Sequence, residues 1–186
     1  FSKEQLGDLA PKVAAAIAEV HKIEVPGEGY GGWGINRRGL FKSWNEYLLA
    51  NLAQEGFEDR SFCDADFNLS LRREILKLVS FCPEERVVLH GDCAPANILS
   101  DGKRVTALID WGDSLYGDPL HDVACIDFWA SKNDFTAVFR EYYLDNGGLP
   151  DNFEERIMCY KLLRAYGSLW FYAYSDQEQS YKKCVQ

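Results

Sequence analysis

Residues 87–99 read VVLHGDCAPANIL, and ALIDWG follows at residues 107–112. Short apolar runs precede or border three polar residues in this stretch, Asp92, Asn97 and Asp110. A carboxylate at the end of a buried apolar strand is costly unless it is paired or binds a metal. Two such carboxylates and an amide, all within nineteen residues, therefore indicate a functional site and not a solvated surface.

The order His-x-Asp-x-x-x-x-Asn over residues 90–97 has the layout of the protein-kinase catalytic loop, His-Arg-Asp-x-x-x-x-Asn. In that loop the aspartate takes the hydroxyl proton and the asparagine holds magnesium. Asp110, in Asp-Trp-Gly, stands where kinases have Asp-Phe-Gly and their main magnesium ligand. Gly91 in place of arginine separates the chain from the protein kinases.

A further pattern, Gly-Asp-Pro-x-x-Asp, occupies residues 117–122. Together with His-Gly-Asp and Ile-Asp-Trp, it resembles the aminoglycoside phosphotransferase family of small-molecule kinases. Within that family, residues 115–119 and 126–129 look most like the hygromycin phosphotransferase branch. The resemblance implies a protein-kinase-like α+β fold. This chain would form its mostly helical C-terminal lobe, with a small β-hairpin carrying the catalytic and metal-binding loops.

The same resemblance implies roles for single residues. Asp92 would be the catalytic base, and Asn97 and Asp110 would hold Mg²⁺ against the phosphates of ATP or GTP. His90 and Asp122 would support the loop. Without the family, Asp122 is equally well explained as an acidic residue in the first turn of a helix, where it favours the helix dipole.

A predicted hairpin supports the shared metal. Residues 97–100 and 103–109 form predicted strands around an Asp-Gly turn at residues 101–102. The turn sets the two strands side by side, so Asn97 and Asp110 are expected to meet at their open end. The alternative is a structural hairpin whose polar ends are merely solvated.

Hydrophobic periodicity and capping signals predict helices elsewhere. Pro11 is expected at the first helical turn of one helix, and Asn133 is expected to cap another. The glycine-rich segment 26–39 follows a helix and lacks a Gly-Lys-Ser/Thr ending, so we expect a connector or a frame for the acceptor and not a phosphate loop. The predicted helices cover residues 11–21, 43–54, 66–79, 118–130 and 133–145, with a long last helix from residue 151; one more strand covers residues 86–90.

Composition narrows the class of protein. The 186 residues are 47% hydrophobic, which is typical of a folded domain. A formal charge of −9 argues against a nucleic-acid partner, and no apolar run approaches the ~20 residues that span a membrane. The six cysteines show no Cys-x-x-Cys spacing, which argues against a zinc site and indicates free thiols in a cytoplasmic protein.

The acceptor is the least determined part of the prediction. From Asp113 to Gln186 there are twelve Asp or Glu residues and seven Lys or Arg residues, a surplus that would suit a cationic aminoglycoside. Asp127 and Trp129 are the predicted acceptor contacts, although any single acidic residue there is better explained as one that caps and solvates a helix. Choline, homoserine and fructosamine kinases share these motifs, so a metabolite kinase remains an alternative. A non-catalytic, kinase-like binding module is another.

The residues that precede His90 indicate the domain organisation. A kinase-like enzyme needs a nucleotide lobe with a lysine, a glutamate partner and a covering loop. Only 89 residues precede His90, and they read as helices. We therefore expect residues 1–186 to be the C-terminal lobe, with the N-terminal nucleotide lobe absent from this chain. By itself such a lobe should turn over little or nothing, and its sequence does not indicate an oligomeric state.

Overall fold

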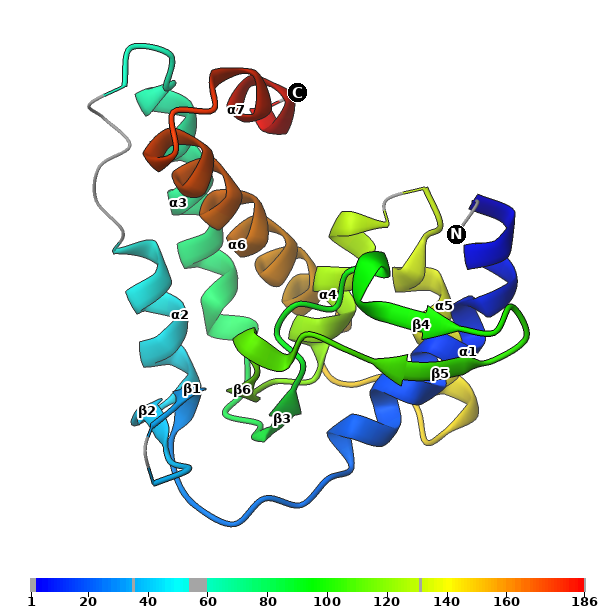
Figure 1. Ribbon diagram of the computed structural model, residues 1–186. Helices are drawn as coiled ribbons and strands as arrows, with labels where there is room; N and C mark the ends of the chain where they lie inside the picture. The colour runs from blue at the N-terminus through cyan, green and yellow to red at the C-terminus, as the bar shows by residue number, and fades with distance from the viewer. Residues whose placement is uncertain (1–2, 35, 54–59, 131, 186) are drawn as a thin grey trace.

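Helices make up most of the computed structural model, which describes residues 3–34, 36–53, 60–130 and 132–185 (Figure 1). The helices are α1 (Lys3–His21), α2 (Trp44–Leu52), α3 (Ala65–Leu78), α4 (Leu120–Trp129), α5 (Phe135–Asp145), α6 (Phe153–Tyr174) and α7 (Glu178–Val185). The strands are β1 (Tyr30–Trp33), β2 (Gly39–Phe41), β3 (Val87–Leu89), β4 (Ile98–Ser100), β5 (Val105–Leu108) and β6 (Leu115–Gly117). Short 3-10 turns cover Val79–Phe81, Pro95–Asn97 and Trp111–Asp113.

One antiparallel sheet fixes the start of the motif region. Its strands run in the order β2-β1-β6-β3, and Leu89 at the end of β3 pairs with Leu115 at the start of β6. The segment that follows residue 113 therefore lies beside the strand that leads into His90. Two segments more than twenty residues apart in sequence thus meet at one edge of the sheet.

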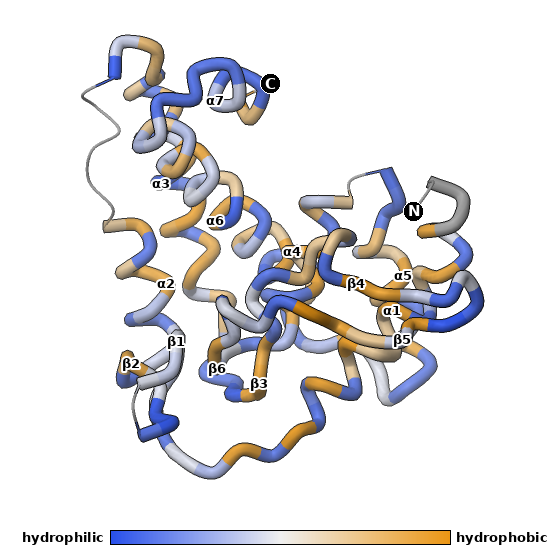
Figure 2. The backbone as a smooth tube through the Cα atoms, viewed as in Figure 1, coloured by the Kyte–Doolittle hydropathy of each residue, from blue (hydrophilic) through white to orange (hydrophobic). Residues whose placement is uncertain are grey.

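The predicted hairpin is present as β4 and β5, with Ile98 opposite Leu108. Asp101 forms its turn, since its carboxylate accepts hydrogen bonds from the backbone N–H groups of Lys103 and Arg104, each at 2.9 Å. The tip is hydrophilic in Figure 2 and rests on α1, where the Lys12 ammonium donates to the Lys103 carbonyl. The hairpin is therefore anchored at its turn, and its open end faces the loop after β3.

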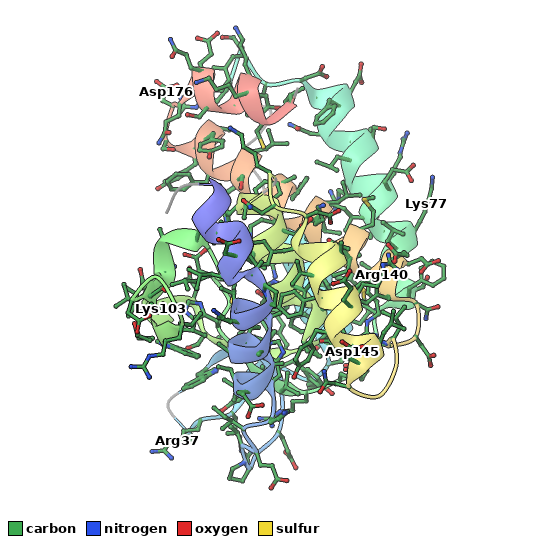
Figure 3. All side chains as sticks on the ribbon, turned by 90° about the vertical axis from the view of Figure 1, so that its right-hand side faces the viewer. Arg37, Lys77, Lys103, Arg140, Asp145 and Asp176 are labelled. Carbon is green, nitrogen blue, oxygen red and sulfur yellow. The ribbon has the colours of Figure 1, made fainter. Side chains whose placement is uncertain are left out.

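Helix α6 organises the core. It packs along α4, α3 and α7, and its buried face includes Tyr160 and Leu169. On the other side of the molecule α1 lies beside α5 (Figure 3). Burial of these apolar faces is the main stabilising term, at roughly 25 cal/mol per Å² removed from water.

The first helix corrects one prediction. Helix α1 begins at Lys3, and Pro11 lies inside it instead of starting it. A proline within a helix costs about 3 kcal/mol because it removes a hydrogen bond and crowds the preceding turn. Here the same buried face continues on both sides of the proline, through Leu9 and Val13, and its packing outweighs that cost.

Two further differences concern caps and loops. Asp134, and not Asn133, caps α5, because its carboxylate accepts a hydrogen bond from the Ala137 N–H at 3.0 Å.

The glycine-rich segment contains β1 and β2 instead of a plain connector. A Cβ on Gly39 would lie 2.1 Å from the Tyr30 nitrogen, so glycine permits the close approach of these strands. The other predicted helices and strands are confirmed, except that the predicted end of the 43–54 helix lies outside the described residues.

A buried ion pair fixes the start of α4. The Asp118 carboxylate accepts hydrogen bonds from Arg156 Nε at 2.8 Å and Nη2 at 2.5 Å, and from the Tyr160 hydroxyl at 2.5 Å. It also accepts the Leu120 N–H at 2.9 Å. Asp118 is fully buried and Arg156 is 1% exposed, so the pair is stabilised only because each of its charges is satisfied.

Candidate active site

The loop after β3 brings Asp92 and Asn97 into direct contact. Asn97 Nδ2 donates to the Asp92 carbonyl at 2.9 Å and to Asp92 Oδ2 at 3.0 Å. The 3-10 turn Pro95–Asn97 produces this approach by folding the chain back after the loop. Since the amide nitrogen is used in both bonds, the Asn97 Oδ1 oxygen is left available as a ligand.

His90 links this loop to the end of β5. Its Nδ1 accepts the Asp92 N–H at 3.3 Å, which leaves Nε2 as the protonated nitrogen that donates to the Ile109 carbonyl at 2.8 Å. The imidazole also lies against the Trp111 ring, with the ring centroids 4.6 Å apart. A single neutral tautomer therefore joins the Asp92 loop to the residue before Asp110.

Asp122 holds the loop after β3 in place through hydrogen bonds to its backbone. From the first turn of α4, its carboxylate accepts the N–H groups of His90 at 2.8 Å and Gly91 at 2.9 Å. His21 at the end of α1 contacts the same carboxylate at 3.1 Å. Complete burial alone would raise the pKa of Asp122, but the hydrogen bond and charge of His21 and the Gly91 N–H hold that pKa below its ordinary value. The carboxylate is thus kept ionised under the loop.

Asp110 stands at the open end of the hairpin. The Ile109 N–H donates to the Asn97 carbonyl at 2.9 Å, so Asp110 follows a residue paired directly with Asn97. Its backbone is left-handed, with φ 63° and ψ 66°, and its side chain is exposed. A non-glycine residue in this region costs about 1–3 kcal/mol, and such strain is concentrated at functional sites.

These oxygens suit a magnesium ion. Mg²⁺ prefers oxygen ligands and is commonly held by one or two carboxylates together with substrate phosphates and water. Asn97 Oδ1 and the Asp110 carboxylate are such donors.

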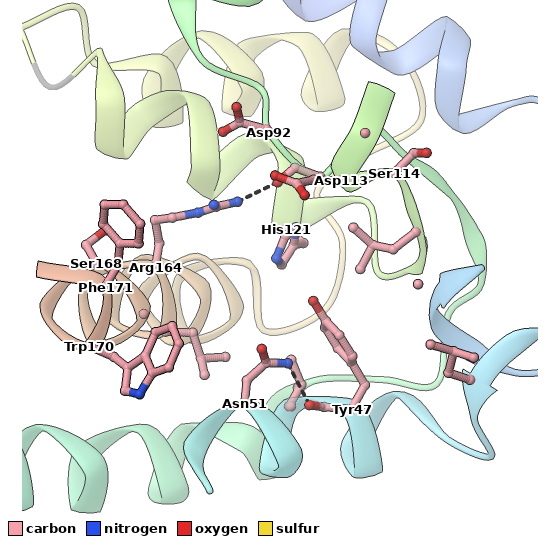
Figure 4. Close-up of a pocket in the computed structure, with 18 of the residues that line it drawn as sticks. Tyr47, Asn51, Asp92, Asp113, Ser114, His121, Arg164, Ser168, Trp170 and Phe171 are labelled. Carbon is pink, nitrogen blue, oxygen red and sulfur yellow. Dashed lines mark hydrogen bonds between the residues drawn. The ribbon is translucent and has the colours of Figure 1, made fainter. Parts of the chain in front are cut away.

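A cleft of about 1130 Å³ opens on the other side of Asp92 (Figure 4). Asp92 and Trp129 line it, whereas Asn97 and Asp110 do not. Asp92 therefore contacts Asn97 at the open end of the hairpin and also lines the cleft. The residues that line the cleft come mainly from β1, α2, the loop after β3, residues 112–115 and α6.

Asp127, which the sequence suggested as an acceptor contact, does not line this cleft. Its Oδ1 accepts the Thr136 N–H at 3.0 Å, and its Oδ2 pairs with Lys161 at 2.7 Å. Burial alone would raise the pKa of Asp127, but the Lys161 ammonium and the Thr136 N–H lower it. The carboxylate ties α4 to α5 and α6, a structural role.

Arg164, Asp113 and His121 are cleft residues that the sequence did not indicate. Arg164 on α6 donates to the Gly91 carbonyl and so holds the loop from the cleft side (Figure 4). Asp113 and His121 line the cleft with it. The hydrogen bond joins residues 73 positions apart, and no local pattern marks such a pair.

His121 is neutral in the folded protein. Burial and the nearby Arg164 charge lower its pKa from 6.5 to about 4, outweighing Asp122 and Asp118, which raise it. The ring packs edge-on against Trp44, and its Nδ1 is buried with no hydrogen-bond partner among the described residues.

We expect the protein to lose stability as the pH falls from about 6.5 to about 4. In this window His121 of the unfolded chain binds a proton and the folded protein does not, so the free energy of unfolding decreases by up to about 1.4 kcal/mol per pH unit. Urea unfolding at several pH values measures the slope. His121→Gln should reduce the dependence of the free energy of unfolding on pH between pH 6.5 and 4. An unchanged slope would show that His121 does not cause this dependence. The contribution of Asp122, whose pKa is lowered, is lost only at still lower pH.

Gly91→Ala is expected to distort the catalytic loop. Gly91 has φ +83°, and a Cβ there would lie 2.0 Å from the Asp113 carbonyl oxygen. Gly148 is the matched control, because its φ is +105° and a Cβ would meet nothing within 4 Å. Gly148→Ala should cost about 1–2 kcal/mol of stability for the backbone alone. Gly91→Ala should lower stability more than this and also abolish function, as thermal unfolding and activity assays would show. Equal losses of stability in the two variants would contradict the clash between the added Cβ and the Asp113 carbonyl oxygen.

Comparisons with known proteins show which family the chain belongs to. The phosphotransferase enzyme family model matches residues 1–158. Hygromycin-B 4-O-kinase from Escherichia coli is 30% identical over 129 residues, which cover 66% of this chain and 38% of that protein. Acyl-CoA dehydrogenase family member 11 from Homo sapiens is 28% identical over 160 residues, which cover 82% of this chain and 19% of that protein.

Solved structures confirm the predicted fold. Aminoglycoside phosphotransferase APH(4)-Ia, in a ternary complex with AMP-PNP and hygromycin B, matches with a TM-score of 0.81 and 22% identity, over 100% of this chain and 64% of that chain. Macrolide 2'-phosphotransferase type I matches with a TM-score of 0.66 and 19% identity, over 95% and 57%. This chain thus spans less than two thirds of the length of these relatives. By its family match and its kinase-like α+β fold, the chain belongs to the phosphotransferase enzyme family, as its motifs predicted.

Proposed function

We propose that the complete protein transfers the γ-phosphate of ATP or GTP to a hydroxyl group of a small molecule, with Mg²⁺ as cofactor. The observation that carries this proposal is the position of Asp92, which bonds to Asn97 on the metal side and lines the cleft on the other. An acceptor in the cleft would meet the nucleotide phosphates at this carboxylate. The relatives that bind AMP-PNP or act on hygromycin B support the reaction class.

Asp92 would orient the acceptor hydroxyl and take its proton. The acceptor oxygen forms a bond to the γ-phosphorus, the bond from that phosphorus to the bridging oxygen breaks, and the nucleoside diphosphate leaves. Asn97 and Asp110 would hold the magnesium ion, which when bound neutralises charge on the phosphates. His90, Asp122 and Arg164 act on the position of the loop and do not touch the reacting atoms.

We further propose that this chain is the lobe that carries the catalytic loop, and that the remaining length of the relatives corresponds to the nucleotide lobe. Its coverage of 64% of APH(4)-Ia supports this division. None of the described helices is long and apolar enough to cross a bilayer. All six cysteines are free thiols, which supports a reducing compartment, the cytoplasm, where nucleoside triphosphates are supplied.

The test is phosphate transfer by the complete protein. Purified protein, MgCl₂ and ATP or GTP would be combined with hygromycin B, other aminoglycosides, choline, homoserine or fructosamine, and the phosphorylated product detected by mass spectrometry. A product that requires magnesium supports the proposal and separates an antibiotic kinase from a metabolite kinase. Tight nucleotide binding without transfer to any acceptor, including those of the next section, would instead identify a non-catalytic binding module.

A further inference from the structure

The charges that line the cleft differ from those that the composition suggests. Of the twelve Asp and Glu residues from Asp113 onward, only Asp113 lines the cleft among the described residues. Asp118, Asp122 and Asp127 are buried in hydrogen bonds and ion pairs elsewhere. Most of this acidic surplus therefore lies outside the cleft and cannot pair with an acceptor bound there.

The remaining cleft charges oppose a polycation. Besides Asp113, the cleft contains the Asp92 carboxylate, which the proposed reaction reserves for the acceptor hydroxyl. Arg164 adds a guanidinium, and His121 is neutral because its pKa is about 4. One spare carboxylate thus faces one cation. Among the described residues, the further ammonium groups of a polycation would find no carboxylate partner in this cleft.

Several aromatic side chains line the cleft. Trp33, Trp129 and Phe171 are 47%, 44% and 52% exposed although they line it. In Figure 4, Phe171 and Trp170 extend from α6, and Tyr47 extends from α2 on the opposite side. Large exposed aromatic residues gathered in a concave site are typical of recognition of flat apolar groups.

Resting on the proposed transfer reaction, we infer that the acceptor is an uncharged alcohol with a flat apolar face, such as an aryl glycoside, and that the cleft discriminates against polycations. The aromatic rings bind the flat face, and the hydroxyl approaches Asp92. The phosphate and proton move as in the proposed reaction, with no further reactant.

Calorimetric titration of the complete protein without nucleotide tests this inference by binding alone. The probes are phenyl β-D-glucopyranoside, which is uncharged, and kanamycin A, which carries several ammonium groups, both at 0.15 M salt. We expect the glucoside to bind at least tenfold more tightly. Phe171→Ala should weaken glucoside binding by about threefold to tenfold. Phe81→Ala, at a phenylalanine that is 39% exposed outside the cleft, should leave it unchanged.

A second pair of variants tests the electrostatic argument. Gly167 lines the cleft, and a Cβ there would meet nothing within 4 Å. Gly167→Asp should raise the affinity for kanamycin A by about fivefold relative to Gly167→Asn, the effect of one carboxylate near an ammonium in a well-hydrated site. Tighter binding of kanamycin A than of the glucoside, or an unchanged affinity in Phe171→Ala, would overturn the inference.

The two proposals fail separately. Transfer of phosphate to kanamycin A, with kanamycin A also the tighter ligand, would uphold the reaction and overturn the acceptor class. Binding of the glucoside in the cleft with no phosphate transfer to the glucoside or to any other acceptor would uphold the recognition of flat uncharged groups and overturn the reaction.

Discussion

Asp92→Asn is expected to lower kcat for phosphate transfer by about 10²–10⁴-fold, the usual contribution of a general base. The amide cannot accept the acceptor proton at neutral pH. Its oxygen can still face Asn97 Nδ2, which now bonds to Asp92 Oδ2 at 3.0 Å, so the loop should keep its shape. Nucleotide affinity should therefore change little, because the proposed metal ligands are other residues.

Steady-state rates with a productive acceptor, together with nucleotide titration, measure both quantities. Asp145→Asn is the matched control, because Asp145 is an exposed residue at the end of α5, far from the cleft lining (Figure 3). The Asp145→Asn variant should have full activity. Near-normal transfer by Asp92→Asn would show that Asp92 is not the base.

Asp118→Ala is expected to lower the free energy of unfolding by about 3–5 kcal/mol. The substitution leaves the Arg156 guanidinium, which is 1% exposed, without its bidentate partner. Glu85, 3.4 Å away, is half exposed and compensates only weakly. The Tyr160 hydroxyl and the Leu120 N–H lose their acceptor as well.

Urea unfolding monitored by circular dichroism measures this loss. Asp145→Ala, which removes an exposed carboxylate, should change stability by less than about 0.5 kcal/mol. The double variant Asp118→Leu/Arg156→Met should recover much of the loss, because it removes both charges and not one. If Asp118→Ala cost no more than the surface control, the buried network would not be a stabilising element.

The sequence predicted the part of the site that is local. Asn97 and Asp110 flank one hairpin, which the turn signal at residues 101–102 predicted, and Asp92 lies in the loop just before it. The Asp122 contact was implied by the family and is present as two backbone hydrogen bonds to the loop. Helix ends marked by side-chain caps, such as Ser43, were also predictable.

The parts that depend on distant packing could not be predicted. Arg164 reaches the loop from 73 residues away, and Tyr30–Trp33 pairs with residues 115–116 in addition to the nearby strand β2. The charge of a segment also did not reveal where its side chains point. Asp127 and Asp113 are acidic residues of the same segment, yet Asp127 is buried in an ion pair with Lys161, whereas Asp113 lines the cleft.

The carboxylate of Asp122 also has a consequence for how the protein folds. It joins His21, 101 residues earlier, to the N–H group of His90, 32 residues earlier. Both contacts require closure of long loops, whose entropic cost delays them relative to helix formation. We therefore expect φ-values near zero at Asp122, and the reactive geometry to be the last part of the lobe to form during refolding.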